Sequence, residues 1–227
     1  MRVIILIDAD NFTNGLVNVS KSKKQFRYVD YYKINKFVIE YLRKNLQYKD
    51  CDIQHLRTYY YTGKFTENLI SRIEYVLQKE KDASRKAALS TLIEKAKKSK
   101  KIQTEFLKLA KDYYYFEIRD KPLQFSPSTL KIFQKGVDVQ LAVDLVEFAY
   151  KNTFDIAVIL SGDIDLIESV RTTKNLGKHV IIFGDESVTS VEMRREADMY
   201  INLRRFDDKQ LNQISHIKRD SEQGISF

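Results

Sequence analysis

The chain has 227 residues, of which 43% are hydrophobic, and it contains only 2 Pro and 7 Gly. We therefore expect one compact unit, because the chain is too short for two full domains and too poor in Pro and Gly for long flexible linkers. The single cysteine, Cys51, excludes an internal disulfide, and with 3 His it gives no zinc-ligand pattern. The formal net charge of +8 favours a polyanionic partner.

The N-terminal apolar stretch, residues 3–7, predicts a first strand rather than a signal peptide or a membrane-spanning helix. The stretch is too short for either, and Asp8 and Asp10 follow it at once. Together with the lone cysteine, this pattern predicts a cytoplasmic protein without a membrane segment.

Strand and helix patterns alternate in the next part of the chain. A turn carrying Asn11 and Asn14–Gly15 is expected after the first strand, and residues 32–46 predict a helix because their apolar side chains recur on one face. Residues 52–61 are rich in β-branched and aromatic side chains, which predicts a strand that Gly63 stops. Residues 113–118 predict a third strand, followed by irregular chain around the two prolines.

Residues 66–111 show a helical pattern that is longer than one crossover connection needs. We expect this segment to protrude as a basic helical excursion, since residues 79–101 carry an excess of six positive charges. Residues 20–49 carry an excess of seven. These two segments account for more than the whole net charge, and they fit either arms that hold a phosphate backbone or solvated helix faces.

The C-terminal half continues the alternation. A helix from Gly136 to about residue 150, a strand at 156–160 and a helix at 165–175 are expected first. A strand at 180–183, a helix at 188–197 and a short strand at 199–203 follow, and the polar tail 207–227 predicts a short helix or disorder. This alternation predicts an α/β fold whose mostly parallel sheet has about five to six strands and helices on both faces.

Four aspartates lie where this topology brings chain segments to one sheet edge: Asp8, Asp138, Asp163 and Asp165. Several carboxylates in one crevice repel each other unless a cation lies among them, and Mg²⁺ prefers oxygen ligands. Each aspartate also fits a helix N-cap, for which Asp is a preferred residue. Convergence favours a metal site because caps have no reason to share an edge, and the small residues Ser161–Gly162 suit a turn that approaches a phosphate.

Three motifs carry a family resemblance, and they are Asp8–Ala9–Asp10–Asn11, the run from Lys135 to Asp144, and Ser161–Gly162–Asp163–Ile164–Asp165. In this order they resemble the NYN domain family of PIN-like metal-dependent ribonucleases. The resemblance implies a PIN-like three-layer α/β/α sandwich over residues 1–206, with 66–111 as an excursion within it and 207–227 as a tail. It also implies metal-dependent cleavage of RNA, with Asp8, Asp138, Asp163 and Asp165 as catalytic ligands of Mg²⁺ or Mn²⁺.

The chain departs from the family pattern in two places. Asp10 stands where the family commonly has a small residue, and it is a candidate to support the ligands from outside. Leu166 and the two residues after it replace an aromatic residue and a proline, which affects the start of the local helix. Asp144 lies six positions after Asp138, so helical periodicity turns it away from that residue and predicts a supporting or structural role.

The candidate substrate-binding residues are of two kinds. Asn11, Lys135 and Ser161 lie within the motifs, and Lys135 fits either a phosphate contact or an exposed loop lysine. Lys23, Lys24 and Arg27 precede the tyrosines at 28, 31 and 32, and such interleaving suits unpaired bases. The tyrosines at 59–61 and 113–115 are expected to be packing residues within strands.

Two other functions remain open at this stage. Asp8 and Asp10 have the spacing of a haloacid-dehalogenase-like phosphatase, in which Ser161 would bind phosphate, but Phe12 and the position of Lys135 before Ser161 do not suit that family. A noncatalytic RNA-binding module would keep the fold and the charge. The expected partner is RNA, single-stranded or structured, and a homo-oligomer is possible on sequence grounds.

Overall fold

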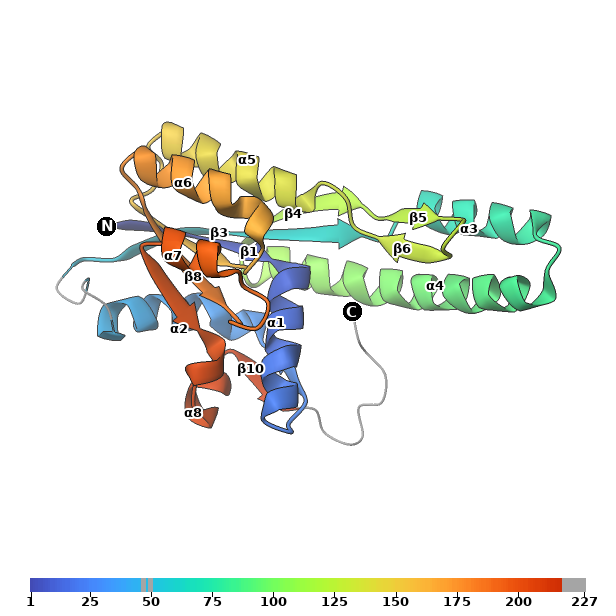
Figure 1. Ribbon diagram of the computed structural model, residues 1–227, viewed down its shortest axis with the longest axis horizontal. Helices are drawn as coiled ribbons and strands as arrows, with labels where there is room; N and C mark the ends of the chain where they lie inside the picture. Colours follow the sequence, from blue (N-terminus) through green and yellow to red (C-terminus); the bar gives the residue numbers. More distant parts are fainter. Residues whose placement is uncertain (46–47, 49–50, 218–227) are drawn as a thin grey trace.

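The computed structural model describes residues 1–45, 48 and 51–217. Its centre is a parallel sheet of six strands in the order β4-β3-β1-β7-β8-β9 (Figure 1). This confirms the α/β class and the expected mostly parallel sheet. The strands are β1 (Arg2–Asp8), β3 (Gln54–Lys64), β4 (Phe116–Pro122), β7 (Ile156–Leu160), β8 (His179–Gly184) and β9 (Met199–Asn202).

Helices cover both faces of this sheet and complete a three-layer sandwich (Figure 1). Val3, Ile5 and Ile7 of β1 belong to the hydrophobic core on one face of the sheet, and Ile4 and Leu6 belong to the core on the other face. The alternation of side chains along a strand explains why both sets are buried. On the first face lie α1 (Ala9–Ser22) and α2 (Tyr31–Asn45), and on the second α5 (Val137–Tyr150), α6 (Ile167–Asn175) and α7 (Val191–Glu196).

The turn expected after the first strand is instead the start of α1, so this prediction was wrong. Asp8 caps the helix by accepting a hydrogen bond from the Asn11 amide, and Phe12 and Leu16 are buried on one face of it. Gly15 lies inside the helix, where a Cβ would stand 3.6 Å from that of Asp185. Tertiary packing therefore overrides the turn preference of the Asn14–Gly15 pair.

The boundaries of β3 and β4 also differ from expectation. β3 continues through Gly63 to Lys64, because the glycine allows the close approach of Leu123, whose side chain a Cβ would overlap. β4 begins three residues later than expected, since Tyr113 caps the preceding helix and Tyr115 has a positive φ of 57°.

The expected helical excursion forms two helices, α3 (Glu67–Lys79) and α4 (Ala83–Asp112), which extend beyond the sheet (Figure 1). Part of the chain expected to be irregular instead forms a hairpin, β5 (Gln124–Ser126) and β6 (Lys131–Phe133), against them. These elements have a hydrophobic core of their own that includes Ile73, Leu89 and Phe125. We call α3, α4, β5 and β6 the arm.

The remaining elements of the C-terminal half follow the expected order. The helix expected at 165–175 begins as a 3-10 turn, η1 (Ile164–Leu166), and α7 is shorter than expected. Leu46, the expected end of the second helix, lies outside the described residues. Within the described part of the chain, no helix is both long and apolar enough to cross a membrane.

The first part of the C-terminal tail packs on the domain. After the 3-10 turn η2 (Leu203–Arg205), the expected short helix is α8 (Asp208–Leu211), and it is followed by β10 (Ser215–Ile217), which pairs with β2 (Arg27–Val29) in an antiparallel ribbon. Leu211 and Ile214 are buried in the core under α1 and α2. Residues up to 217 therefore belong to the same folded unit, and residues 218–227 of the expected tail lie outside the described chain.

Arg27 holds this ribbon in place and does not face solvent, since only 1% of the residue is exposed. Its guanidinium donates hydrogen bonds to Asn212 Oδ1 at 2.6 Å and to Gln25 Oε1 at 2.8 Å. Asp208 Oδ1 lies 3.5 Å away as a counter-charge. The geometry gives Arg27 a structural contact with the tail in place of the expected RNA contact.

Replacing Arg27 should therefore destabilise the fold. We expect Arg27→Ala to lower the free energy of unfolding by about 2–4 kcal/mol, because it opens a cavity and leaves buried acceptors unpaired. Denaturant unfolding measures this change, with Lys24→Ala as the exposed control expected to change stability by less than about 0.5 kcal/mol. Equal stability of the two variants would contradict the structural role of Arg27.

Candidate functional site

The site lies where the adjacent strands β1 and β7 end. The two strands pair in parallel with Ile7 opposite Leu160, so Asp8 and Ser161 leave the sheet side by side. Asp163 follows two residues later and caps η1. The carboxyl edge of a parallel sheet is where such folds place ligands, and the structure brings two of the predicted acidic motifs to this edge.

Hydrogen bonds fix the backbone around these carboxylates. Ser161 Oγ donates to Asp8 Oδ2 at 3.3 Å and accepts from the Asp163 amide at 3.2 Å. Asn11 Oδ1 accepts a hydrogen bond of 2.7 Å from the Gly162 amide. A Cβ on Gly162 would overlap Thr189, so this position needs a glycine for close packing. Asn11 and Ser161 therefore join α1 to the turn after β7.

Asp8 is the most perturbed acid of the site. Only 4% of the residue is exposed, and burial raises the pKa of its carboxyl group from 3.8 to about 6. The nearby charges of Asp10 and Asp163 raise this pKa further, while the hydrogen bonds from Asn11 and Ser161 oppose the shift. Convergence of anions in a poorly hydrated site is the condition that a divalent cation relieves.

Asp10 and Asp165 are more open to solvent. Asp10 keeps an exposed carboxylate, but it lies in a concave surface whose walls reduce its hydration and raise its pKa. Asp165 is also exposed, and its amide donates to Asp163 Oδ1 at 3.1 Å. Asp8 and Asp163 thus do cap helices as the alternative interpretation expected. The cap engages Oδ1 of each carboxylate, and Oδ2 of Asp8 accepts the hydrogen bond from Ser161.

The second motif, residues 135–144, lies for the most part on α5. Asp138 is on the first turn of α5, which follows Gly136 in a left-handed conformation with φ 78° and packs against η1. Asp144 points elsewhere, since it accepts a hydrogen bond from Tyr61 Oη at 2.9 Å and pairs with Arg119 Nε at 3.3 Å. Asp144 therefore ties α5 to β3 and β4.

The donor set fits an open metal site and not a closed cage. Among the residues that the structure describes, no group of three or more His, Cys, Asp or Glu is placed so that it could hold a metal ion. The four predicted ligands are therefore not brought together as one ready cluster. Mg²⁺ often binds through one or two carboxylates and completes its shell with water and substrate phosphate. Asp8 and Asp163, whose charges interact, are the candidates for such a smaller set of ligands.

Asp185 is an acidic residue of this region that the sequence analysis missed. It follows β8, is 1% exposed and forms an ion pair with Arg204. Burial opposes its ionisation, but hydrogen bonds from Arg204 and Ser187 keep its pKa below 3.8. The sequence signal that could have identified Asp185 was its position shortly after the apolar run 180–183. Arg204 neutralises the charge of Asp185. This ion pair holds the start of the loop that packs on Gly162.

The three lysines that were predicted to bind substrate differ in their surroundings. Lys23 Nζ donates to the Phe206 carbonyl at 2.6 Å, which holds the end of α1 to the C-terminal segment. Lys24 has a positive φ of 56° just beyond α1. Lys135 is exposed between β6 and α5, two residues after an aromatic side chain, Phe133, that lines a groove.

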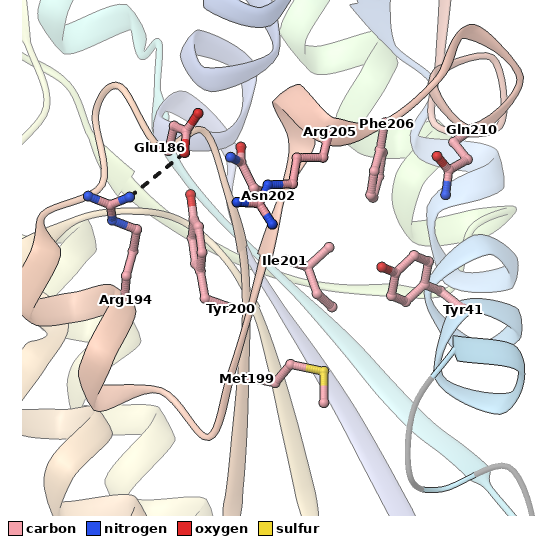
Figure 2. Close-up of a pocket in the computed structure, with 10 residues that line it drawn as sticks. All are labelled: Tyr41, Glu186, Arg194, Met199, Tyr200, Ile201, Asn202, Arg205, Phe206 and Gln210. Carbon is pink, nitrogen blue, oxygen red and sulfur yellow. Dashed lines mark ion pairs between the residues drawn. The ribbon is translucent and has the colours of Figure 1, made fainter.

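This groove, of about 730 Å³, opens beside the acidic site. Ala9 and Asp10 form part of its wall, together with α4, the end of β3 and the β2–β10 ribbon. A second pocket, of about 320 Å³, lies along the edge strand β9 (Figure 2). There Arg194 and Glu186 form an ion pair, while none of the four predicted metal ligands, all of them described, lines that pocket.

Comparisons with known proteins agree with this architecture. A family model of the NYN domain matches residues 2–204, so the chain belongs to the NYN domain family, which has a nuclease-like fold. An uncharacterized protein of Methanocaldococcus jannaschii is 33% identical over 73 residues, which cover 32% of this chain and 30% of that protein. The crystal structure of a protein of unknown function from Vibrio parahaemolyticus matches with a TM-score of 0.54 and 17% identity over 95% of this chain and 96% of that chain.

The perturbed pKa of Asp8 yields a stability test. Its pKa of about 6 exceeds the unfolded value of 3.8, so the folded state loses stability as pH rises between these values. Without metal at about pH 8, Asp8→Asn should raise the free energy of unfolding by up to about 3 kcal/mol, and this gain should vanish near about pH 4. Chemical unfolding in a chelator measures it. A gain that does not depend on pH would contradict the assignment.

Proposed function

We propose that this protein is a metal-dependent ribonuclease that hydrolyses RNA phosphodiester bonds at the edge formed by β1 and β7. The observation that carries the proposal is the buried carboxyl of Asp8, whose pKa is raised to about 6 by burial and by the charges of Asp10 and Asp163. Membership of the NYN domain family supports a nuclease, and the basic surface supports a polyanionic substrate.

In this proposal Asp8 and Asp163 hold Mg²⁺ or Mn²⁺, and Asp138 and Asp165 approach from α5 and η1. A divalent cation held there would supply positive charge for the phosphodiester oxygens and would lower the pKa of an attacking water. Asn11 and Ser161 fix the turn that carries Asp163, which keeps the carboxylates in place before substrate arrives. Lys24 and Lys135 are available to neutralise neighbouring phosphates.

The two other functions considered from the sequence receive less support. The NYN model spans nearly the whole chain, which does not favour a haloacid-dehalogenase-like phosphatase. A noncatalytic RNA-binding module would gain nothing from a buried Asp8, because burial disfavours the ionised carboxylate. Cleavage assays separate all three, because a phosphatase would release phosphate from a small ester and a binding module would retain RNA without shortening it.

Removing one carboxylate should abolish cleavage without unfolding the protein. We expect Asp163→Asn to reduce the rate of cleavage of single-stranded RNA by at least about 100-fold, because a neutral amide binds a divalent cation weakly. Gel analysis of end-labelled RNA in Mg²⁺ or Mn²⁺, with a chelator in parallel, measures the rate. Asp112→Asn, which changes an exposed carboxylate at the end of α4, is the matched control and should cleave normally.

Metal binding should also be visible without turnover. We expect Mn²⁺ to raise the thermal unfolding temperature of the wild-type chain by relieving repulsion around Asp8, and to raise that of Asp8→Asn and Asp163→Asn much less. Differential scanning fluorimetry at about pH 8 measures the three shifts. An equal shift in all three proteins would place the ion elsewhere and remove Asp8 and Asp163 from the proposal.

A further inference from the structure

We propose that the groove beside Asp10 receives unpaired bases of single-stranded RNA next to the phosphate that is cleaved; this inference rests on the proposed ribonuclease function. The groove lies between the domain and the arm and has a volume of about 730 Å³, within the range of small-molecule sites. Its aromatic lining residues are Tyr28, Tyr31, Tyr60, Phe65, Phe106 and Phe133.

The groove begins beside the acidic site, although none of the four predicted metal ligands, all of them described, lines it. Ala9 and Asp10 line it, and they follow directly on Asp8, whose carboxylate is at the centre of the proposed metal site. At the opposite wall, Phe133 and Gln134 line the groove immediately before Lys135. A base in the groove would therefore bring its own phosphate between Lys135 and the carboxylates, where cation and lysine charges favour it.

The aromatic wall is organised before any ligand binds. Tyr31 packs edge-on against Tyr60 with 5.2 Å between ring centroids, and Phe106 lies 5.3 Å and 5.5 Å from these two rings. Tyr31 Oη also lies within hydrogen-bond distance of Thr13 Oγ1, at 3.1 Å. Tyr60 is only 6% exposed and supports the wall from behind, whereas Phe133 is 41% exposed and is free to meet a base. Rigid aromatic faces bind bases with little loss of side-chain freedom, and they accept every base because each has an apolar face.

The groove is lined by one acidic residue, Asp10, and by no Lys or Arg of the described chain, so positive charge comes from elements next to it. Ser99, Gln103, Phe106 and Leu107 place one face of α4 along the groove. The same helix carries exposed lysines in the segment with the basic excess, among them Lys95 and Lys98. An apolar groove beside a basic helix suits a chain that has flat bases and a charged backbone. Bases within a duplex are stacked on each other and do not present their faces, so the groove selects single strands.

Phe133 offers a direct optical test. The chain has no Trp, and Phe133 is 41% exposed at the groove wall, so Phe133→Trp introduces a single reporter without opening the core. In a chelator, we expect single-stranded RNA of about 12 nucleotides to quench the tryptophan emission through base stacking. Inorganic polyphosphate and an RNA duplex of the same length provide charge without free bases, and neither should quench it.

Affinity provides the second measurement. We expect Phe133→Ala to weaken binding of the same labelled RNA by about tenfold, and Phe133→Trp to keep wild-type affinity, because the stacking surface is lost only in the first variant. Tyr150→Ala is the matched control, since Tyr150 is a 79% exposed aromatic residue on α5 that does not line the groove. It should bind RNA as the wild type does.

The outcomes separate the groove from the nuclease. Quenching by single-stranded RNA with no metal-dependent cleavage would support the groove and contradict the ribonuclease. Cleavage that needs Asp163, without quenching and with full affinity in Phe133→Ala, would overturn the groove and keep the ribonuclease. Quenching by duplex or by polyphosphate, or emission that changes with protein concentration alone, would also overturn the assignment to unpaired bases.

Discussion

Burial of the Asp8 carboxylate at the end of β1, with other carboxylates nearby, is the constraint on which the rest of the site depends. Asp8 is almost fully buried with the charges of Asp10 and Asp163 close by, which is unfavourable in isolation. The fold maintains this arrangement because Asp8 also caps α1 and accepts a hydrogen bond from Ser161. These bonds favour the ionised form and partly offset burial, so the site is held in a state that a cation would stabilise.

Apolar packing in the parallel sheet determines where this site lies. Buried side chains on both faces of β1 and β7 fix their register, and register places Asp8 beside Ser161. If either strand shifted by one residue, its side chains from the core on one face would move to the core on the other face. Positioning of the carboxylates therefore relies on the packing of the whole sandwich, while hydrogen bonds from Asn11 and Ser161 set only the last local details.

Local patterns were sufficient to predict the ends of β1 and β7, because continuous apolar runs followed closely by aspartate have few other structural explanations. They were insufficient where distant contacts decide the structure. The Asn14–Gly15 pair prefers a turn, yet burial of Phe12 and Leu16 makes it helical. β10 pairs with β2 across most of the sequence, so no local signal indicated that Arg27 would be enclosed. The neutralised Asp185 escaped notice because its partner, Arg204, lies on another element.

The arm and the acidic site are linked by one short segment of chain. Phe133 ends β6 at the groove, Lys135 follows, and Gly136 turns through a positive φ into α5, whose first turn carries Asp138. A displacement of β6 would therefore move Lys135 and Asp138 together, because one residue separates Phe133 from Lys135 and two residues separate Lys135 from Asp138. The same segment that would contact a base also carries a candidate metal ligand, so under the proposed function it would couple recognition of the strand to assembly of the site.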